Sequence, residues 1–357
     1  MTMYTARNRI KRGIINIYHS LSLDKLRMFS GGFDKQINDA IKQFGGDSKL
    51  TPQELKSDIK KCYYRHLTRP DEYFLFGFEG KDESYRSAFL SDNLRVRYLL
   101  KTISEEKYVN ELCDKFNFYK MTSKFFKRRV IQVGGTRTCS LKEFINFSEG
   151  CKKAFVKPIS STFGKGAHIV EFPSNTKEIE QIYIKYSQNG GGEWIFEDLI
   201  NQCRETSLWN PTSVNTVRMP CILSGGEFHV LNPFLRTGRK GQVIDNGGSG
   251  GVFACIDETT GIVSSDGIDE QNVAYTHHPD SEIEFKGWEV PKYKELLSLA
   301  ETIFRTCLPE HKYIGFDFAL TDDGWVLIEG NWGQFLGQYA SKRGVRQKFL
   351  KYLRNNE

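Results

Sequence analysis

The sequence predicts a protein of the α+β class, in which a mainly helical N-terminal region precedes strands that pair mostly in hairpins. Three observations lead to this prediction. Apolar residues recur at helical spacing through much of residues 1–104. From about residue 105, short apolar runs alternate with Gly-containing turns. Residues 314–331 form two alternating apolar runs on either side of a turn, which is the pattern of a β-hairpin.

Length and composition are those of a globular chain with more than one folded unit. The chain has 357 residues, 39% hydrophobic and 13% aromatic, which is enough for a sizeable core. Its eight cysteines are scattered without a Cys-x-x-Cys pair. No apolar run approaches the roughly 18 residues of a membrane span, and no secretory signal pattern is seen. We therefore expect reduced cysteines and a cytoplasmic protein.

Positive charge is concentrated in the first third of the chain. Residues 1–130 hold 26 Lys and Arg against 16 Asp and Glu, whereas residues 131–357 hold 24 against 28. Residues 7–29 place basic side chains between apolar ones at helical spacing. Such a helix either packs on its own protein or lies on an anionic membrane, so peripheral membrane contact is one expectation. The basic patches alone do not indicate a nucleic-acid partner.

The N-terminal helices are predicted at residues 34–44, 51–67 and 90–102. The run Thr51-Pro52-Gln53-Glu54 is a helix start, because it offers a capping Thr, a Pro in the first turn and a Glu at the third helical position. No Gly-x-Gly-x-x-Gly sequence joins a strand to a helix here, so no dinucleotide site is expected.

Strands and helices alternate in the rest of the chain. Helices are expected at residues 113–126, 141–147, 176–186, 291–307 and, as a basic tail, 338–357. Strands are expected at residues 130–133, 154–158, 167–172, 193–200, 213–219, 228–235, 251–257 and 261–264.

A small Gly-punctuated loop, Ser160-Ser161-Thr162-Phe163-Gly164-Lys165-Gly166, joins two of these strands. Its backbone N–H groups can approach phosphate oxygens closely, while Lys157 and Lys165 supply positive charge. It is not a Walker-type loop, because no Gly-Lys-Ser/Thr opens a helix. Taken alone, the loop fits a phosphate cradle and a plain glycine hairpin equally well.

Acidic and basic side chains follow at the ends of the next strands. Glu197 and Asp198 end a buried strand and need a partner, for which a ribose diol, a Lys or solvent would each serve. Strand alternation puts Arg218 on the face of Thr216. Arg236 opens the first of two Gly-rich loops, residues 236–241 and 245–251, which we expect to act as lids over an anion.

The hairpin at residues 314–331 carries three oxygen ligands. Alternation puts Asp317 on the face opposite its Phe neighbours and puts Glu329 and Asn331 together on the returning strand. Two carboxylates and a carboxamide form a hard-oxygen cluster that suits Mg²⁺. The alternative interpretation is that the two acids simply face solvent.

The order of these motifs resembles the ATP-grasp superfamily. The runs Ser213-Val214-Asn215-Thr216-Val217-Arg218 and Ile244-Asp245-Asn246-Gly247-Gly248-Ser249-Gly250-Gly251 resemble its sugar-transfer-associated branch. The resemblance covers about residues 105–340. It implies an ATP-grasp fold, in which two α+β subdomains with mainly antiparallel sheets sandwich ATP. The expected divisions are a helical domain at 1–104, a subdomain with the phosphate loop at 105–198, and a subdomain with the metal site at 199–357.

The resemblance also implies roles for individual residues. Phosphate oxygens would be held by lysines, the loop at 160–166 would close over the triphosphate, and residues 197–200 would contact adenine and ribose. The implied nucleotide-binding residues are Lys115, Lys157, Ser161, Gly164, Lys165, Gly166, Glu197, Asp198, Leu199 and Ile200. The implied metal ligands are Asp317, Glu329 and Asn331, with Glu329 bridging two Mg²⁺ ions and Mn²⁺ as the alternative ion. The implied catalytic residues near the transferred phosphate are Arg218 and Asn246, to which we add Arg236 as a substrate anchor.

The activity implied by the resemblance is that of an ADP-forming carboxylate–amine ligase. A carboxylate would take the γ-phosphate of ATP, and an amine would then displace phosphate from the acyl phosphate. Family context indicates an amino acid or other amine joined to a sugar acid or related carboxylate in polysaccharide biosynthesis, with a nucleotide sugar as a further candidate substrate. The alternatives are a small-molecule kinase on the same fold and a non-catalytic protein that binds a membrane or nucleic acid.

Overall fold

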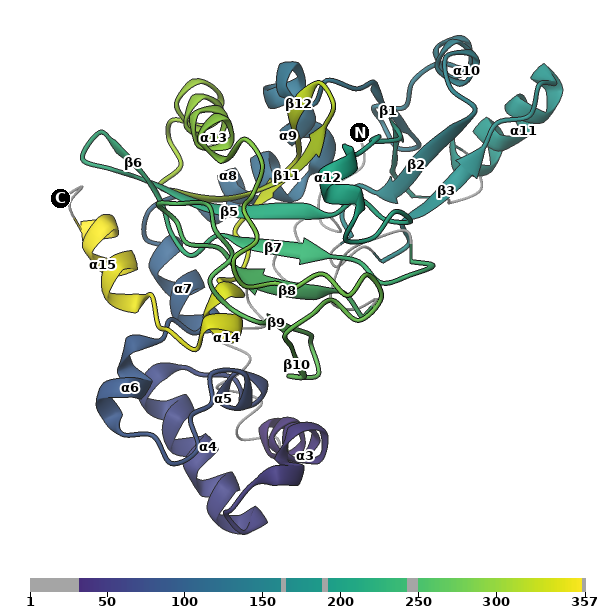
Figure 1. Ribbon diagram of the computed structural model, residues 1–357. Coiled ribbons are helices and arrows are strands. Elements are labelled where there is room, and N and C mark those ends of the chain that lie inside the picture. Colours follow the sequence, from purple (N-terminus) through teal and green to yellow (C-terminus); the bar gives the residue numbers. More distant parts are fainter. Residues whose placement is uncertain (1–31, 162–164, 188–191, 243–249, 355–357) are drawn as a thin grey trace.

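Two antiparallel sheets and a helical N-terminal unit make up the computed structural model (Figure 1), which describes residues 32–161, 165–187, 192–242 and 250–354. The predicted α+β class is confirmed. The basic helix expected at residues 7–29 lies outside the described residues. Among the described helices, none combines the length and the apolar character needed to cross a membrane. The eight cysteines, all of them among the described residues, form no disulfide.

The helical unit contains α3 (Gly32–Phe44), α4 (Pro52–His66), α5 (Pro70–Leu75), α6 (Glu83–Ala88) and α7 (Asp92–Leu99). The expected start of α4 is confirmed, because the Thr51 side chain accepts from the Glu54 backbone while Glu54 accepts from the Thr51 backbone. Helices α5 and α6 were not predicted, since six residues are too few to show a periodic pattern. The core of this unit is aromatic and continues onto the large sheet through Phe234 and Phe253.

The connection to the sheets is helical but broken. Helix α8 (Glu105–Tyr108) continues into a π-helical turn (Val109–Cys113), and α9 (Lys115–Thr122) follows. The single helix expected at 113–126 is therefore wrong at its start. Asp114 interrupts it, because its side chain accepts from the backbone N–H groups of Phe116 and Asn117 and so caps a new helix.

The small sheet has the order β1-β4-β2-β3. Its strands are β1 (Val130–Val133), β2 (Lys153–Pro158), β3 (His168–Glu171) and β4 (Trp194–Asp198), and each paired neighbour is antiparallel. Helices α10 (Leu141–Glu149) and α11 (Thr176–Ser187) pack against it through a separate hydrophobic cluster that includes Phe144 and Phe196.

The large sheet has the order β10-β9-β8-β7-β5-β11-β12, and β6 also pairs with β5. Its strands are β5 (Thr216–Ser224), β6 (Glu227–Val230), β7 (Phe234–Thr237), β8 (Val252–Cys255), β9 (Gly267–Ile268), β10 (Ala274–Tyr275), β11 (Tyr313–Thr321) and β12 (Gly324–Asn331). Helix α13 (Tyr293–Cys307) covers one face, where Phe304 packs edge-on against Phe316. A short helix, α12 (Arg204–Ser207), leads into β5.

Two predicted elements are split at residues with left-handed backbone. The strand expected at 228–235 is divided into β6 and β7, and Asn232 between them has φ of 55°. The tail expected as one helix is divided into α14 (Gly337–Ser341) and α15 (Arg346–Arg354), with Lys342 at φ of 52°. Neither a strand nor a helix continues through that conformation.

Helix α9 packs directly over β12, next to the predicted metal ligands. The buried ring of Phe118 lies on Gly330, which stands between Glu329 and Asn331. A side chain at residue 330 would collide with this ring, so glycine allows the helix to approach the strand closely. This approach carries Lys115, at the start of α9, toward the hairpin.

We expect Gly330→Ala to lower the free energy of unfolding by about 1–3 kcal/mol in urea denaturation. A Cβ at residue 330 would lie 2.6 Å from two atoms of the Phe118 ring. Gly46→Ala is the matched control, because no heavy atom lies within 4 Å of a Cβ there. It should change stability by less than about 0.5 kcal/mol. Equal effects of the two substitutions would contradict the close packing.

Candidate active site

One face of the large sheet carries a row of charged side chains across four strands. Cross-strand register pairs Arg218 of β5 with Asp317 of β11, and Asp317 with Glu329 of β12. Thr216, on the same face as Arg218, pairs with Arg236 of β7. Residues directly opposite each other in an antiparallel pair put their side chains on one face. The row therefore runs from β7 to β12.

Asp317 is the centre of this row. Its side chain is buried and accepts hydrogen bonds from Nε and Nη2 of Arg218, the latter at 2.7 Å. Nη2 of Arg236 lies 3.0 Å from the same carboxylate. Burial would raise the pKa of Asp317, but the two guanidinium groups outweigh it and hold that pKa below its ordinary value. Asp317 is therefore an anion with two cationic partners.

The remaining predicted ligands lie beside Asp317. The register of the hairpin shifts by one residue between Asp317 and Phe318, which brings Glu329 opposite Asp317. Nδ2 of Asn331 lies 3.4 Å from Oε1 of Glu329, and Oδ1 of Asn331 accepts from Nη1 of Arg218 at 3.1 Å. The structure thus brings the three predicted metal ligands together on one face.

The chemistry of these donors fits a hard cation such as Mg²⁺, which prefers carboxylate and amide oxygens. No group of three His, Cys, Asp or Glu is found among the described residues, and here the third oxygen comes from Asn331. Arg218 contacts both Asp317 and Asn331, so a divalent ion using these oxygens has to compete with its guanidinium.

A second buried cluster lies on the small sheet. Oε1 of Glu197 lies 2.5 Å from Nζ of Lys157, and Oε2 lies 2.5 Å from Nη2 of Arg128. Burial would raise the pKa of Glu197, but the two cations lower it to about 2. Arg128 also donates to the carbonyl of Leu327 on β12 at 2.7 Å. One side chain therefore links the two sheets.

Lys115 lies between the two clusters. Its Nζ donates to the carbonyl of Ile159 at 3.3 Å and to that of Ser161. Burial lowers the pKa of Lys115, Glu329 opposes that shift, and Lys157 adds to it. These effects require that Lys115 is near both the hairpin and the small sheet.

The other residues that were predicted to bind the nucleotide are more dispersed. Asp198 pairs with Arg129 at 2.7 Å, so both acids of the strand end have cationic partners within the chain. Ser161 donates from Oγ to the carbonyl of Pro158 at 3.2 Å. Lys165 and Leu199 are exposed, Gly166 has φ of 79°, and Ile200 is half-buried. Gly164 and Asn246 lie outside the described residues.

Sequence reasoning missed Arg128. It stands in the run Phe125-Phe126-Lys127-Arg128-Arg129, in which three basic residues follow each other. Lys127 and Arg129 are exposed, but the Arg128 side chain is only 5% exposed. Charge alone does not distinguish these three neighbours. The acid at Glu197 was the available signal, because a buried carboxylate needs a cation.

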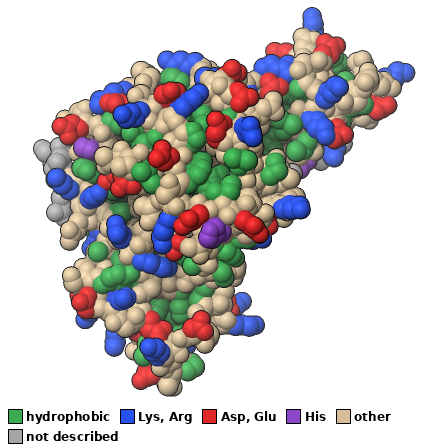
Figure 2. All heavy atoms as spheres, in the orientation of Figure 1, with side chains coloured by type: hydrophobic (Ala, Val, Ile, Leu, Met, Phe, Trp, Pro, Cys, Tyr) green, Lys and Arg blue, Asp and Glu red, His purple; other side chains and the backbone are tan. Residues whose placement is uncertain are grey.

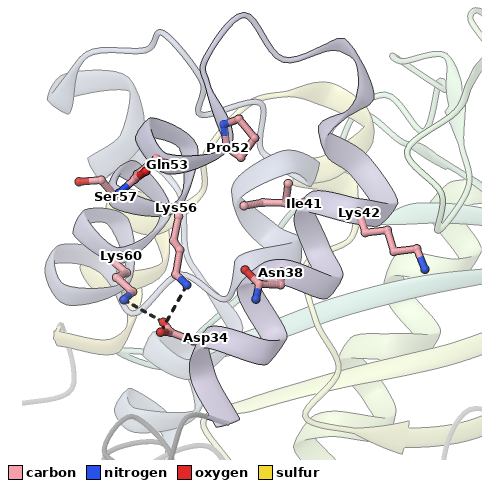
Figure 3. Close-up of a pocket in the computed structure, with 9 residues that line it drawn as sticks. All are labelled: Asp34, Asn38, Ile41, Lys42, Pro52, Gln53, Lys56, Ser57 and Lys60. Carbon is pink, nitrogen blue, oxygen red and sulfur yellow. Dashed lines mark ion pairs between the residues drawn. The ribbon is translucent and has the colours of Figure 1, made fainter.

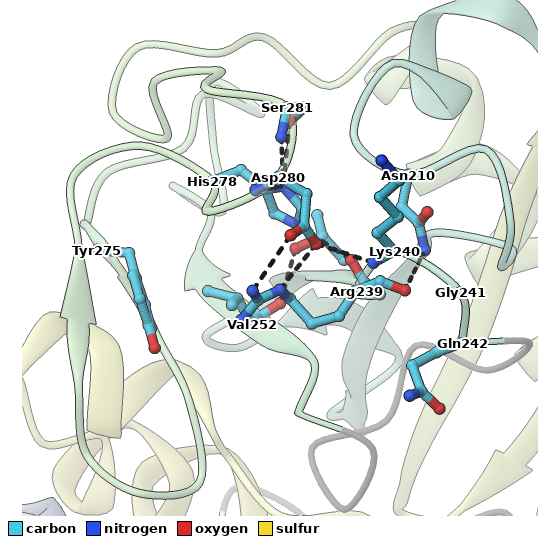
Figure 4. Close-up of polar contacts among 12 residues, drawn as sticks. Asn210, Arg239, Lys240, Gly241, Gln242, Val252, Tyr275, His278, Asp280 and Ser281 are labelled. Carbon is cyan, nitrogen blue, oxygen red and sulfur yellow. Dashed lines mark hydrogen bonds and ion pairs between the residues drawn. The ribbon is translucent and has the colours of Figure 1, made fainter.

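The loop after β7 makes polar contacts with neighbouring segments, and its role as a lid stays a prediction. The backbone N–H of Gly238 donates to Oδ1 of Asn215 at 3.2 Å, and Nε2 of buried His278 lies 3.0 Å from the Gly238 carbonyl. Arg239 forms an ion pair with Asp280 at 2.8 Å (Figure 4). Most of the second loop, at 245–251, lies outside the described residues.

A separate pocket lies between α3 and α4 in the helical unit (Figure 3). Asp34 on its wall forms ion pairs with Lys60 at 2.8 Å and Lys56 at 3.3 Å, while Lys42 stands apart. These lysines are exposed or half-exposed, so their attraction for an anion is screened by water. The sheet face is the stronger candidate, because its charges are buried.

We expect Glu197→Gln to lower the free energy of unfolding at pH 7 by about 3 kcal/mol, because it leaves two buried cations without their anion. The folded-state pKa of about 2 lies below the ordinary value of 4.5, so the stabilisation is full above pH 4.5 and is lost as pH falls toward 2. Urea denaturation across that range measures it. The control is Glu171→Gln, which removes an exposed pair with Lys153 and should cost less than about 1 kcal/mol. If the difference in free energy of unfolding between wild type and Glu197→Gln stayed constant down to pH 2, the ion pairs assigned to Glu197 would be contradicted.

Comparison with solved structures finds distant likenesses. The chain is similar to a D-alanine–D-alanine ligase from Bacillus anthracis, with 12% identity over 68% of this chain and 64% of that one, at a TM-score of 0.37. It is similar to a D-alanyl-alanine synthetase A from Vibrio cholerae, with 11% identity, 68% and 65% coverage and a TM-score of 0.40. It is also similar to an L-amino acid ligase from Bacillus licheniformis, with 12% identity over 66% of this chain and 43% of that one, at a TM-score of 0.38. The chain thus spans less than two thirds of each.

No match is found among curated proteins. The family described as sugar-transfer associated ATP-grasp matches residues 94–354, which is most of the chain and begins within α7. This match confirms the resemblance and the ATP-grasp fold expected from the order of the motifs. The chain belongs to the sugar-transfer associated ATP-grasp family.

Proposed function

We propose that the chain is an ATP-dependent, ADP-forming ligase that joins a carboxylate to an amine through an acyl phosphate. The observation that carries this proposal is the charged row on the large sheet, Arg236–Arg218–Asp317–Glu329, together with Lys115 and Lys157 near its β12 end. Oxygen ligands for a cation and cationic groups for a polyphosphate then belong to one site. That combination suits phosphoryl transfer, in which positioning and charge neutralisation do most of the work.

The chain's own residues divide the binding of ATP between them. Lys115 and Lys157 neutralise phosphate oxygens from the side of the small sheet. Asp317, Glu329 and Asn331 would hold Mg²⁺, with Mn²⁺ as a substitute. The metal supplies charge neutralisation and alignment of the phosphate oxygens when bound.

The reaction has two balanced steps. A carboxylate oxygen of the acid forms a bond to the γ-phosphorus while the bond to the bridging oxygen breaks, which releases ADP. The amine nitrogen then forms a bond to the acyl carbon, phosphate leaves with its oxygen, and the nitrogen loses a proton. Arg218 and Arg236 stabilise the negative charge that develops in both steps.

The substrates are proposed from the family's association with sugar transfer. An amine such as an amino acid would be joined to a sugar acid or a nucleotide-sugar acid in polysaccharide biosynthesis. The free cysteines suit the reducing cytoplasm. Residues 7–29 would supply any peripheral membrane contact. On the face seen in Figure 2, basic and acidic side chains are interspersed over the helical unit, which gives a nucleic-acid-binding function little support.

We expect Glu329→Gln to reduce turnover by about a hundredfold or more, because it removes a negative ligand from the metal site. Asp317→Asn should act in the same direction. Asp322→Asn, at the exposed tip of the same hairpin, is the control and should keep full activity. Far-UV circular dichroism and urea denaturation show whether each variant is folded. Full activity of both site variants would refute the metal assignment.

The proposed reaction itself is tested by mass spectrometry with ATP, Mg²⁺ and a panel of amines and sugar acids. A ligase gives ADP, phosphate and a product whose mass equals acid plus amine less water. A gain of one phosphoryl group on an acceptor, without free phosphate, would instead identify a kinase. Binding to vesicles or DNA with no nucleotide turnover across the panel would favour a non-catalytic role.

A further inference from the structure

A buried guanidinium in the helical unit has donors with no partner. Arg95 lies on α7 and is 4% exposed. Its Nη2 pairs with Asp92, but Nε and Nη1 have no hydrogen-bond partner among the residues that the structure describes. Burying a charged donor without an acceptor is unfavourable, so such groups in folded proteins call for a specific explanation.

Arg95 lies close to the segment that follows the last metal ligand, residues 332–334. Trp332 stacks on Tyr108 with ring centroids 3.8 Å apart, and the hydroxyl of Tyr313 donates to the Gly333 carbonyl at 2.7 Å. Arg95 is near enough to both tyrosines to affect their pKa values, although burial is the main cause of the upward shifts.

The same segment touches the candidate active site on its other side. A Cβ added at Gly333 would collide with Nη1 of Arg218 and lie 2.6 Å from Oδ1 of Asn331. Burial would raise the pKa of Asp92, but Arg95, Arg69 and, one residue further on, Gln334 lower it, so Gln334 lies near Asp92. Residues 332–334 therefore separate the charged row on the sheet from the Asp92–Arg95 pair by the width of one chain segment.

The Asp92–Arg95 pair is also open to solvent on one side. Arg69 joins it through an ion pair with Asp92 at 3.2 Å, and the side chains of Arg69 and Asp92 are 31% and 19% exposed. Two guanidinium groups thus share one internal carboxylate at the edge of the site. Arg69 also pairs with Asp71 at 2.7 Å, so the attraction for a further anion rests on the two unused donors of Arg95.

We propose that Arg95, assisted by Arg69, binds an anionic group of the acid substrate, so that the helical unit forms one wall of its pocket. The bound group is a carboxylate or a phosphate, since both accept hydrogen bonds from guanidinium donors. It would pair with the unused Nε and Nη1 and share the cations with Asp92. The reacting carboxylate of the same substrate would then face Arg218 across Gly333. This inference rests on the ligase function proposed above.

Two probe anions, inorganic phosphate and malonate, test the site by calorimetric titration of the full chain saturated with Mg²⁺ and a non-hydrolysable ATP analogue. When the ATP analogue fills the nucleotide site, that site no longer binds the probe anions. We expect Arg95→Gln to weaken binding of the preferred probe by about tenfold or more. Arg97→Gln, an exposed arginine on the same helix, is the matched control and should bind as wild type does. If Arg95→Gln weakens the binding of inorganic phosphate, the bound group is a phosphate. If it weakens the binding of malonate, the group is a carboxylate.

Asp92→Asn gives a second test that works even if Arg95→Gln does not fold. Removing the internal anion should tighten binding of the same probe, because Arg69 and Arg95 lose their competitor. A purely structural ion pair predicts lower stability with no gain in affinity. Absence of probe binding to wild type, or equal binding by wild type and Arg95→Gln, would overturn the proposal. Failure of wild type to bind the ATP analogue would instead overturn the ligase function.

Discussion

The charge of buried Asp317 constrains the arrangement of the large sheet more than any other single interaction. A carboxylate removed from water needs cationic or hydrogen-bonding partners, and here they come from Arg218 on β5 and Arg236 on β7. These partners reach it only in the observed register, because a slip of one residue would turn the arginines to the opposite face. The register of these strands and the charged row on the sheet therefore depend on each other.

With the proposed metal, the same constraint would give the site two states. Without a divalent ion, Arg218 neutralises Asp317 and contacts Asn331, which keeps these oxygens compatible with burial. An ion that used the oxygens would take over that neutralisation and would repel the guanidinium. Arg218 would then remain on the face where the proposed reaction develops negative charge. Metal binding and anion binding would then favour each other, as linkage between coupled sites requires.

The two sheets are coupled by a different cation. Arg128 joins Glu197 on β4 to the Leu327 carbonyl on β12, and Glu197 in turn holds Lys157. The position of Lys157 relative to the hairpin therefore depends on a chain of buried contacts. A movement of one sheet against the other would have to break these contacts or preserve them by moving Arg128 and Glu197 together.

The sequence was most informative where one local rule decides the structure. Alternation of apolar residues predicted the hairpin and the shared face of its oxygen ligands, because strand geometry fixes which side chains lie together. It could not predict the breaks at Asn232 and Lys342, since a left-handed residue outside glycine depends on tertiary packing. Arg128 was missed for the same reason: burial of one basic residue in a run of three is decided by a partner 69 positions away.

The helical unit shows how far such tertiary effects reach. Its last helix does not form a separate core, because Leu94 and Leu99 of α7 belong to the same hydrophobic cluster as Phe316 and Leu327 of the hairpin. Packing of α7 on the large sheet brings a buried arginine next to the segment after Asn331. Glycine at residue 333 lets the guanidinium of Arg218 approach that segment closely. An element outside the two sheets could therefore contribute to the proposed choice of substrate without contacting ATP.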